Sequence, residues 1–303
     1  MDLIVDLYLR REYELAALQL ALAMAGMGAL LRPRDFAAVF AAPAALVLGL
    51  VVQLGGVPIV AAAVMAIAAP GAGIAAGLAL VAAVPGGTMS NLLTFLARGN
   101  TPLSVTLTGL TTAACLVTTP LLLGLLLPAD LAQNVSMPVA RIITEIVLVL
   151  LLPLAGGMIV AAHLPDWRHG VARWAVRASL ALIGVIVIGA AGAGRVDPGA
   201  HGASGLLAIA LLAVGAQCLA LVVAWRAGLA RGDATAIGIE VTIRNTNLAL
   251  LLKASLFPAR PGVADPIGDA VLFVALLYGG LALPASVPLL IAARRSAPPA
   301  TLA

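Results

Sequence analysis

The chain has 303 residues, of which 62% are hydrophobic and only 10% are charged, and its mean hydropathy is +1.12. Soluble domains contain about half apolar and about a quarter charged residues, so the composition excludes an ordinary soluble protein and predicts a polytopic membrane protein. The net charge of +4 comes with loop arginines that membrane anchoring explains without a nucleic-acid partner. The sequence lacks alternating β-barrel patterning, so we expect an all-α fold.

Long apolar runs predict the membrane helices in chain order. Residues 1–12 mix apolar and charged side chains, and we expect either a short interfacial helix or a disordered leader there. The run 58–98 exceeds the roughly 20 residues of one crossing, so it should hold a helix to about Ala69, a turn and then a broken crossing. Residues 168–177 are expected to form the most basic loop. The expected spans, about nine in all, are 15–31, 36–54, 58–98, 102–127, 138–162, 178–194, 205–225, 234–257 and 270–293.

The arginines between these spans are unevenly divided between the two sides of the membrane. Positively charged loops stay in the cytoplasm, so the N-terminus is predicted outside and the C-terminus inside, which requires an odd number of crossings. We therefore expect a multi-pass protein of a bacterial inner membrane. The inner side collects ten arginines, Arg32, Arg34, Arg98, Arg168, Arg173, Arg177, Arg226, Arg231, Arg294 and Arg295, and the outer side four, Arg10, Arg11, Arg195 and Arg260.

Two polar interruptions break apolar segments at corresponding positions in the two halves of the chain. The first, Val84–Asn91, contains Pro85, two glycines and three side chains with oxygen atoms. Proline and glycine open the helical backbone, which at membrane depth is tolerated only where it is buried in protein or lines a wet cavity. The second, Glu240–Asn247, holds a carboxylate, a guanidinium, two amides and two hydroxyls. Paired breaks of this kind indicate the binding site of a secondary transporter.

Glu240 is the strongest functional candidate, because an ionisable side chain inside the membrane costs at least about 2.5 kcal/mol on insertion scales. The alternative is a structural ion pair with Arg244, one helical turn away. Lys253 is expected to extend toward the outer membrane surface. Other oxygen-bearing side chains near the breaks fit together as a cage for a hard cation such as sodium. These are Ser90, Asn91, Ser104 and Thr108.

The motifs at both breaks resemble those of the bile acid:sodium symporter family. The likeness is carried by Pro85-Gly-Gly-Thr-Met-Ser-Asn91 and Glu240-Val-Thr-Ile-Arg-Asn245. It is supported by Gly26-Met-Gly-Ala-Leu-Leu-Arg-Pro-Arg-Asp-Phe36, Leu96-Ala-Arg-Gly-Asn100 and Leu103-Ser-Val-Thr-Leu-Thr108. It runs from about residue 20 to the last span.

The resemblance implies two inverted five-helix repeats, arranged as a panel domain and a core domain in which the two broken helices cross. With about nine crossings, the chain resembles the members that lack the first helix. We expect an interfacial segment at 1–12, a single transmembrane transporter domain at 13–295 and a C-terminal tail at 296–303. The core is expected around 58–127 and 205–257, the panel comprises the remaining helices, and the protein is expected to be a monomer.

The resemblance also implies two sodium sites, with sodium as the coupling ion and no organic cofactor. The first would be formed by Ser90, Asn91, Ser104, Thr108 and Glu240, and every one of these positions carries a suitable side chain. The second would use Gln53, Glu240 and backbone carbonyls near Val241 and Ile243, with a glutamine where this chain has Arg244. Our hypothesis is that the guanidinium of Arg244 replaces that second ion, so that fewer sodium ions are coupled to each cycle.

Half-helix N-termini carry free N–H groups and a partial positive charge, which suit an anion. We therefore expect the substrate carboxylate near Thr88, Asn245 and Asn247, and Arg244 facing that carboxylate is an alternative role for the arginine. The resemblance implies uptake of an organic acid, either bile acid-like or small such as pantoate, by alternating access with sodium. The spans hold no paired carboxylates and no nucleophile–base set, so enzymatic activity is not expected.

Two other functions stay open at this point. In proton-coupled transport, Glu240 would carry the proton with Arg244 as its partner. The chain could instead be a non-transporting membrane receptor for the same acids. The intact hydroxyl and amide set around the breaks favours sodium, because a proton carrier does not need it. Beyond the organic anion, sodium and membrane lipid, no partner is expected.

Overall fold

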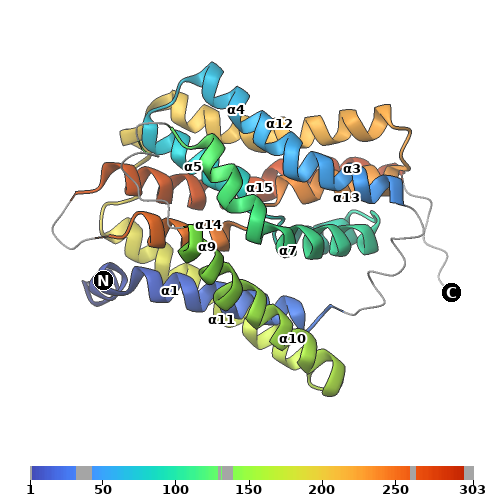
Figure 1. Cartoon of the computed structure of the whole chain (residues 1–303), viewed down its shortest axis with the longest axis horizontal. Coiled ribbons are helices and arrows are strands. Elements are labelled where there is room, and N and C mark those ends of the chain that lie inside the picture. Colours follow the sequence, from blue (N-terminus) through green and yellow to red (C-terminus); the bar gives the residue numbers. More distant parts are fainter. Residues whose placement is uncertain (1, 32–42, 129–130, 132–138, 260–263, 297–303) are drawn as a thin grey trace.

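The computed structural model describes residues 2–31, 43–128, 131, 139–259 and 264–296, and their regular structure is helical apart from one isolated β-bridge. The expected all-α fold is therefore confirmed (Figure 1). The elements are α1 (Asp2–Gly28), α3 (Pro43–Val51), η2 (Val52–Gly56), α4 (Val57–Ala68), α5 (Ala72–Ala83), α6 (Met89–Leu96), α7 (Thr101–Leu126), α9 (Val139–Glu145), η3 (Ile146–Leu151), α10 (Leu152–His163), α11 (Arg168–Gly192), η4 (Pro198–His201), α12 (Gly202–Arg226), α13 (Arg231–Thr242), α14 (Thr246–Leu256) and α15 (Pro266–Ser296).

Six helical runs within the described residues are long and apolar enough to cross a membrane. The helices α5 and α14 are apolar but shorter, because each is one half of a broken segment. The helix α1 begins at Asp2 and has a non-helical residue, Arg11, at φ −130° and ψ 27°. The N-terminal segment is therefore helical, as one of the two sequence expectations had it. The six runs are Pro43–Ala68, Thr101–Leu126, Val139–His163, Arg168–Gly192, Pro198–Arg226 and Pro266–Arg294.

The predicted break between spans 36–54 and 58–98 is wrong, because Pro43–Ala68 is one continuous helical run. Residues 36–42 of the predicted span lie outside the described residues. The glycine pair at 55–56 stays helical within a π turn, in which Val57 N–H donates to Val52 O. The first π turn precedes Pro58, and a second π turn, η3, precedes Pro153 in the same way. In an apolar environment the backbone must satisfy its own hydrogen bonds, and a π turn lets a helix continue past a proline that has no N–H.

The predicted basic loop at 168–177 is also wrong, since these residues form the first turns of α11. The helix begins ten residues before the expected start of its apolar span, and Trp174 lies exposed on these turns. The arginines of this segment are long side chains that can reach water from a helix end, so they do not require a loop.

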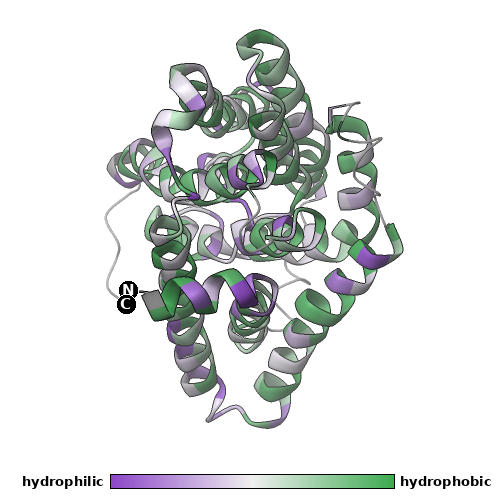
Figure 2. Ribbon diagram, turned by 90° about the vertical axis from the view of Figure 1, so that its left-hand side faces the viewer, coloured by the Kyte–Doolittle hydropathy of each residue, from purple (hydrophilic) through white to green (hydrophobic). Residues whose placement is uncertain are grey.

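The helices form two groups that meet along the middle of the molecule. In one group, α1 packs against α10 and α11, at the bottom of Figure 1. In the other, α5 packs against α15 and α7, and α12 packs against α4 and α13. The helix α15, which the sequence analysis placed with the panel, packs against α5, α12, α13 and α14. Most of the helical ribbon is apolar, and hydrophilic segments also occur among the helices in the interior of the bundle (Figure 2).

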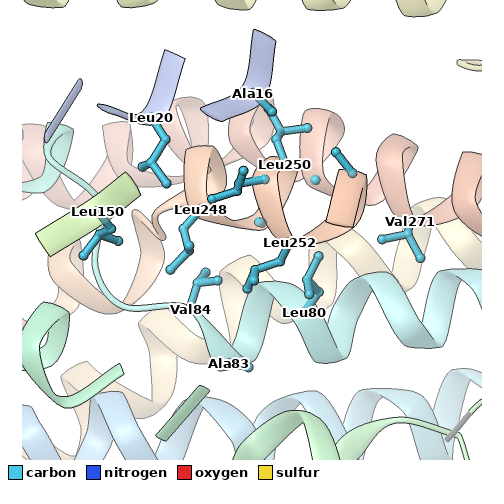
Figure 3. Close-up of a cluster of buried hydrophobic side chains, with 14 of the residues drawn as sticks. Ala16, Leu20, Leu80, Ala83, Val84, Leu150, Leu248, Leu250, Leu252 and Val271 are labelled. Carbon is cyan, nitrogen blue, oxygen red and sulfur yellow. The ribbon is translucent and has the colours of Figure 1, made fainter. Parts of the chain in front are cut away.

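The half-helix α14 lies at the junction of the two groups. Its Leu248, Leu250 and Leu252 are buried in one apolar cluster with Leu20 of α1 and Leu80 of α5 (Figure 3). Since lipid is as apolar as leucine, this packing is favoured by close van der Waals contact rather than by exclusion of water. The packing fixes the start of α14, and with it the polar segment that precedes the helix.

Candidate functional site

The two broken segments cross each other at their unwound residues. The first opens between α5 and α6, and the second between α13 and α14. Gly87 N–H donates to Ile243 O over 2.7 Å, and Asn245 N–H donates to Pro85 O over 2.9 Å. Together with the isolated β-bridge between Gly86 and Arg244, these bonds satisfy backbone groups that the breaks release. The sequence expectation of two helix breaks is confirmed.

Close approach at the crossing requires the glycines. A Cβ atom on Gly86 would overlap the Oε1 atom of Glu240, and one on Gly87 would lie 2.6 Å from the Arg244 carbonyl oxygen. Any other residue at these positions would push the two segments apart. The glycine pair therefore lets the carboxylate of Glu240 lie against the opposite backbone.

Glu240 is completely buried and is surrounded by hydroxyl groups. Thr108 Oγ1 lies 2.7 Å from Glu240 Oε1, and Ser104 Oγ lies 3.1 Å from Glu240 Oε2. The same two hydroxyls lie 3.3 Å and 2.9 Å from the Oδ1 atom of Asn91. Ser90 Oγ lies 3.4 Å from Thr108 Oγ1. The structure thus brings all five residues proposed for the first sodium site into one cluster.

This cluster contains more acceptor oxygens than hydroxyl protons. Thr108 has one proton but lies within hydrogen-bond distance of Glu240, Asn91 and the Ser104 carbonyl oxygen. Ser104 also has one proton for two acceptors, and Ser90 is directed to Gly87 O at 2.7 Å. Several oxygens must therefore face one another without a hydrogen between them. A hard cation bound by carboxylate, amide, hydroxyl and carbonyl oxygens fits this chemistry.

Thr94 belongs to the same cluster, although the sequence analysis did not identify it. It is buried on α6, and its Oγ1 donates to Ser104 Oγ over 3.3 Å. Its position four residues after Ser90 on one helix is the signal that could have found it. Thr94 orients a hydroxyl that in turn contacts Glu240.

Arg244 does not form the structural ion pair with Glu240 that was the alternative to a functional role, because the ion pairs of the described residues do not include it. Its guanidinium instead donates to three carbonyl oxygens at the C-terminal end of α5. Nε donates to Val81 O over 3.2 Å, and Nη2 donates to Ala82 O over 2.8 Å and to Val84 O. The negative end of a helix dipole favours such a cation.

Gln53 lies beside this guanidinium, on the π turn η2. With its amide oriented to suit both neighbours, its oxygen accepts from Gly86 N–H at 2.8 Å and from Arg244 Nη1 at 3.3 Å. Val241 and Ile243, whose carbonyls were expected in a second sodium site, are buried at the end of α13. The Ile243 carbonyl already accepts a hydrogen bond from Gly87 N–H. Arg244 and Gln53 therefore share the space next to Glu240.

A cavity of about 170 Å³ lies between the crossing and the α1–α11 pair. Its wall includes Thr88, Asn245 and Asn247, the three residues expected near the substrate. Asn245 uses its side-chain oxygen to accept from Leu248 N–H over 3.1 Å, so its amide NH₂ is the end that this cap does not use. Both half-helix N-termini, of α6 and α14, begin beside this cavity, and this arrangement favours an anion.

A second buried charged cluster lies at the far end of α14. Lys253 is completely buried, and its Nζ lies 2.6 Å from Glu12 Oε1, so the expected extension of Lys253 to the membrane surface is wrong. Arg195 also pairs with Glu12, at 3.1 Å, and with Asp269 of α15. Tyr8 O–H donates to Glu12 over 2.9 Å. The ammonium group of a lysine does not need to reach water when a buried carboxylate balances its charge.

Comparison with known proteins places this chain in a family. Residues 17–194 match the sodium bile acid symporter family. The chain belongs to this family. It is 35% identical over 171 residues to an uncharacterized sodium-dependent transporter of Bacillus subtilis, covering 56% of the chain and 51% of that protein. It is 30% identical over 277 residues to a probable chloroplastic sodium/metabolite cotransporter of rice, covering 90% of the chain and 63% of that protein.

A third relative is a probable chloroplastic sodium/metabolite cotransporter of Arabidopsis thaliana, 35% identical over 139 residues, covering 46% of the chain and 33% of the relative. The chain thus spans from a third to somewhat under two thirds of the length of these relatives. This family consists of multi-span membrane transporters, and the relatives found here are described as sodium-dependent transporters or sodium/metabolite cotransporters.

Proposed function

We propose that the protein imports a small organic anion together with sodium by alternating access. The single observation that carries the proposal is the cluster around Glu240, where a buried carboxylate is surrounded by neutral hydroxyls that have too few protons for their acceptors. The cavity beside the half-helix N-termini supplies the place for an anion. Family membership supports sodium as the coupling ion.

The proposed sodium ligands are the side chains of Ser90, Asn91, Ser104, Thr108 and Glu240. Their donor atoms are all oxygens, which hard cations prefer. The cation would balance the buried charge of Glu240, an arrangement that stabilises the crossing only while the ion is bound. Sodium binding thereby links the ion gradient to the shape of the substrate cavity.

We propose that Arg244 acts as a tethered cation in place of a second sodium ion. Its guanidinium is buried and donates to the carbonyls that end α5, and Gln53 also accepts from it. A charge that is covalently attached needs no ion from solution. The expected consequence is that one sodium ion is coupled to each substrate.

The size of the cavity favours a small acid over a sterol acid. About 170 Å³ is well below the roughly 300–1,000 Å³ of sites for drug-sized ligands. The substrate carboxylate would lie by Thr88, Asn245 and Asn247, where the N–H groups of two half-helices converge. The rice and Arabidopsis relatives are described as sodium/metabolite cotransporters, which agrees with a small metabolite.

Alternating access in this chain would move one helix group against the other. We propose nine crossings in two inverted repeats, with the N-terminus outside and the C-terminus in the cytoplasm of a bacterial inner membrane. The panel would contain α1, α10 and α11, and α15 would move with the core because it packs on α5, α12, α13 and α14. The protein would act as a monomer, since one chain supplies both groups.

Thermal unfolding of the purified protein in detergent tests the proposal, in sodium against potassium at equal ionic strength. A ligand that binds only the folded state raises the unfolding midpoint. We expect a sodium-specific rise that Glu240→Ala and Asn91→Ala both abolish. Glu14→Ala, an exposed carboxylate on α1, is the matched control and should keep the full sodium response.

Proton coupling is the second candidate, because Glu240 is fully buried and has no cation within ion-pair distance among the described residues. In that case the midpoint would be equal in sodium and potassium but would depend on pH, and Glu240→Gln would remove the pH dependence. A sodium-specific rise excludes this candidate as the main coupling mode.

A further inference from the structure

Opposite the half-helix N-termini, the cavity wall contains a polar pair from the other helix group. Gln19 of α1 and Ser179 of α11 both line the cavity. Gln19 is 1% exposed and Ser179 is 4% exposed. The Nε2 atom of Gln19 donates to Ser179 Oγ over 2.9 Å, whereas its Oε1 atom lacks a hydrogen-bond partner in the described part of the chain.

An unpaired buried amide oxygen is unfavourable, because it has lost its hydrogen bonds to water without replacement. Had Gln19 served only to join α1 and α11, both ends of its amide would be expected to bond across the two helices. Instead one end is bonded and the other is buried without a partner, on a side chain that lines a cavity. A molecule that occupies the cavity lies next to this side chain and can supply the missing hydrogen bond.

The charge of the cavity restricts what that molecule can offer. Among the described residues that line the cavity, none is acidic, and Arg244 is the charged one. An ammonium group would have no carboxylate to balance it there, so a neutral donor is favoured. A hydroxyl both donates and accepts, so it satisfies the free end of the Gln19 amide in either orientation of that amide.

We propose that Gln19 is a specificity-determining residue that binds a hydroxyl group of the substrate, so that the transported anion is a small hydroxylated carboxylic acid. This inference rests on the proposed function. The carboxylate lies by Thr88, Asn245 and Asn247, and the hydroxyl lies across the cavity at Gln19. The substrate then contacts both helix groups at once, α1 on one side and the crossing on the other.

The test compares acids that differ by one hydroxyl group, in saturating sodium. The probes are lactate against propionate, and β- and γ-hydroxybutyrate against butyrate. Their dissociation constants are measured by thermal shift on the wild type, Gln19→Leu and Gln19→Met. The matched control is Gln217→Leu, because Gln217 of α12 is also buried and also has an unpaired amide atom, but it does not line the cavity.

We expect at least one hydroxy acid to bind the wild type and Gln217→Leu about tenfold more tightly than its deoxy partner, as one neutral hydrogen bond allows. Gln19→Leu and Gln19→Met should bind both acids of that pair equally. Equal binding of every pair by the wild type overturns the inference even if neither Gln19 variant folds, and so does a preference that survives in a folded Gln19 variant.

Failure of the inference is distinguishable from failure of the proposed function. If sodium stabilises the protein but the acids bind without preference, the sodium-coupled anion site stands and the role of Gln19 falls. If sodium stabilises the protein and no probe acid binds, the assignment of a small hydroxy acid falls. If sodium has no specific effect, the proposed coupling fails and the inference fails with it.

Discussion

Glu12 and Glu240 are both buried carboxylates within the helical bundle, but their surroundings differ in one respect. Glu12 is paired with the cations of Lys253 and Arg195 and accepts from the hydroxyl of Tyr8. Glu240 is contacted by the neutral hydroxyls of Ser104 and Thr108. The first carboxylate has two cations within ion-pair distance, whereas the hydroxyls that contact the second carry no charge and Arg244, although nearby, donates to carbonyls of α5 instead.

The difference separates a structural role from a functional one. A buried ion pair whose members are both present is complete and gains nothing from solution. A buried carboxylate held by hydroxyls is incomplete until a cation or proton arrives, and the surplus of oxygen acceptors around Glu240 favours a cation. Burial alone does not distinguish the two, because both glutamates are buried. The charge of the neighbouring groups does.

The largest expected effect is on the stability that the buried charged cluster around Glu12 provides. Glu12→Gln removes the carboxylate that balances Lys253 and Arg195, and breaking a buried pair in this way costs about 3–5 kcal/mol. The free energy of unfolding, measured in detergent with a chemical denaturant, should fall by about that amount, while the difference between sodium and potassium stays unchanged. The matched control is Glu14→Gln, whose exposed pair with Arg11 should contribute within about 0.5 kcal/mol. Loss of the sodium response in Glu12→Gln would contradict the comparison.

The second effect is the difference in unfolding midpoint between Glu240→Gln and the wild type, which should have opposite signs in potassium and in sodium. Glu240→Gln should unfold at a higher midpoint than the wild type in potassium, because it removes a buried carboxylate that has no cation within ion-pair distance among the described residues and adds amide donors for the surplus oxygens. In sodium at a hundred times its Kd, the wild type should gain about 2.7 kcal/mol that the variant cannot gain. Midpoints in both salts check this prediction. A variant that is less stable than the wild type in both salts by the same amount would assign Glu240 a purely structural role.

A third effect concerns the number of ions. If the guanidinium of Arg244 replaces a sodium ion, Arg244→Gln should raise the Hill coefficient of sodium-driven transport from about 1 toward about 2. Initial rates of uptake in liposomes, measured over a range of sodium concentrations, give this coefficient. Arg244→Lys is the control, since it keeps a positive charge and should keep the lower coefficient. An unchanged coefficient in Arg244→Gln counts against the tethered cation.

The smallest effect is expected at Thr94. Thr94→Val has nearly the same shape but removes the hydroxyl that donates to Ser104, a bond worth about 0.5–1.5 kcal/mol. The Kd for sodium, measured by thermal shift, should rise roughly two- to tenfold. Thr118→Val is the matched control, because the Thr118 hydroxyl donates to Ala114 O of its own helix and should not affect sodium. A sodium Kd that is the same in both variants would remove Thr94 from the cluster.

Local sequence was sufficient for the broken helices and for the polar residues at the crossing. Pro85 and the two glycines after it favour an open backbone through their own conformational properties, and Glu240 is costly inside a membrane in any fold. The same local reasoning was misled at Gly55 and Gly56, where glycine did not end a helix. Their run stays helical because neighbouring helices and the apolar surroundings leave the backbone no better set of hydrogen bonds.

By itself, the sequence therefore determined the membrane class, the all-α fold, the two breaks and the residues with oxygen ligands near them. Only the tertiary structure decided which buried polar and charged groups meet. Lys253 reaches Glu12 across 241 positions of the chain, Arg244 binds carbonyls of α5 rather than Glu240, and Gln19 meets Ser179 across 160 positions. The physical reason is that helix breaks and insertion costs are local properties of a segment, whereas the partner of a buried polar group depends on which distant helices the packing brings beside it.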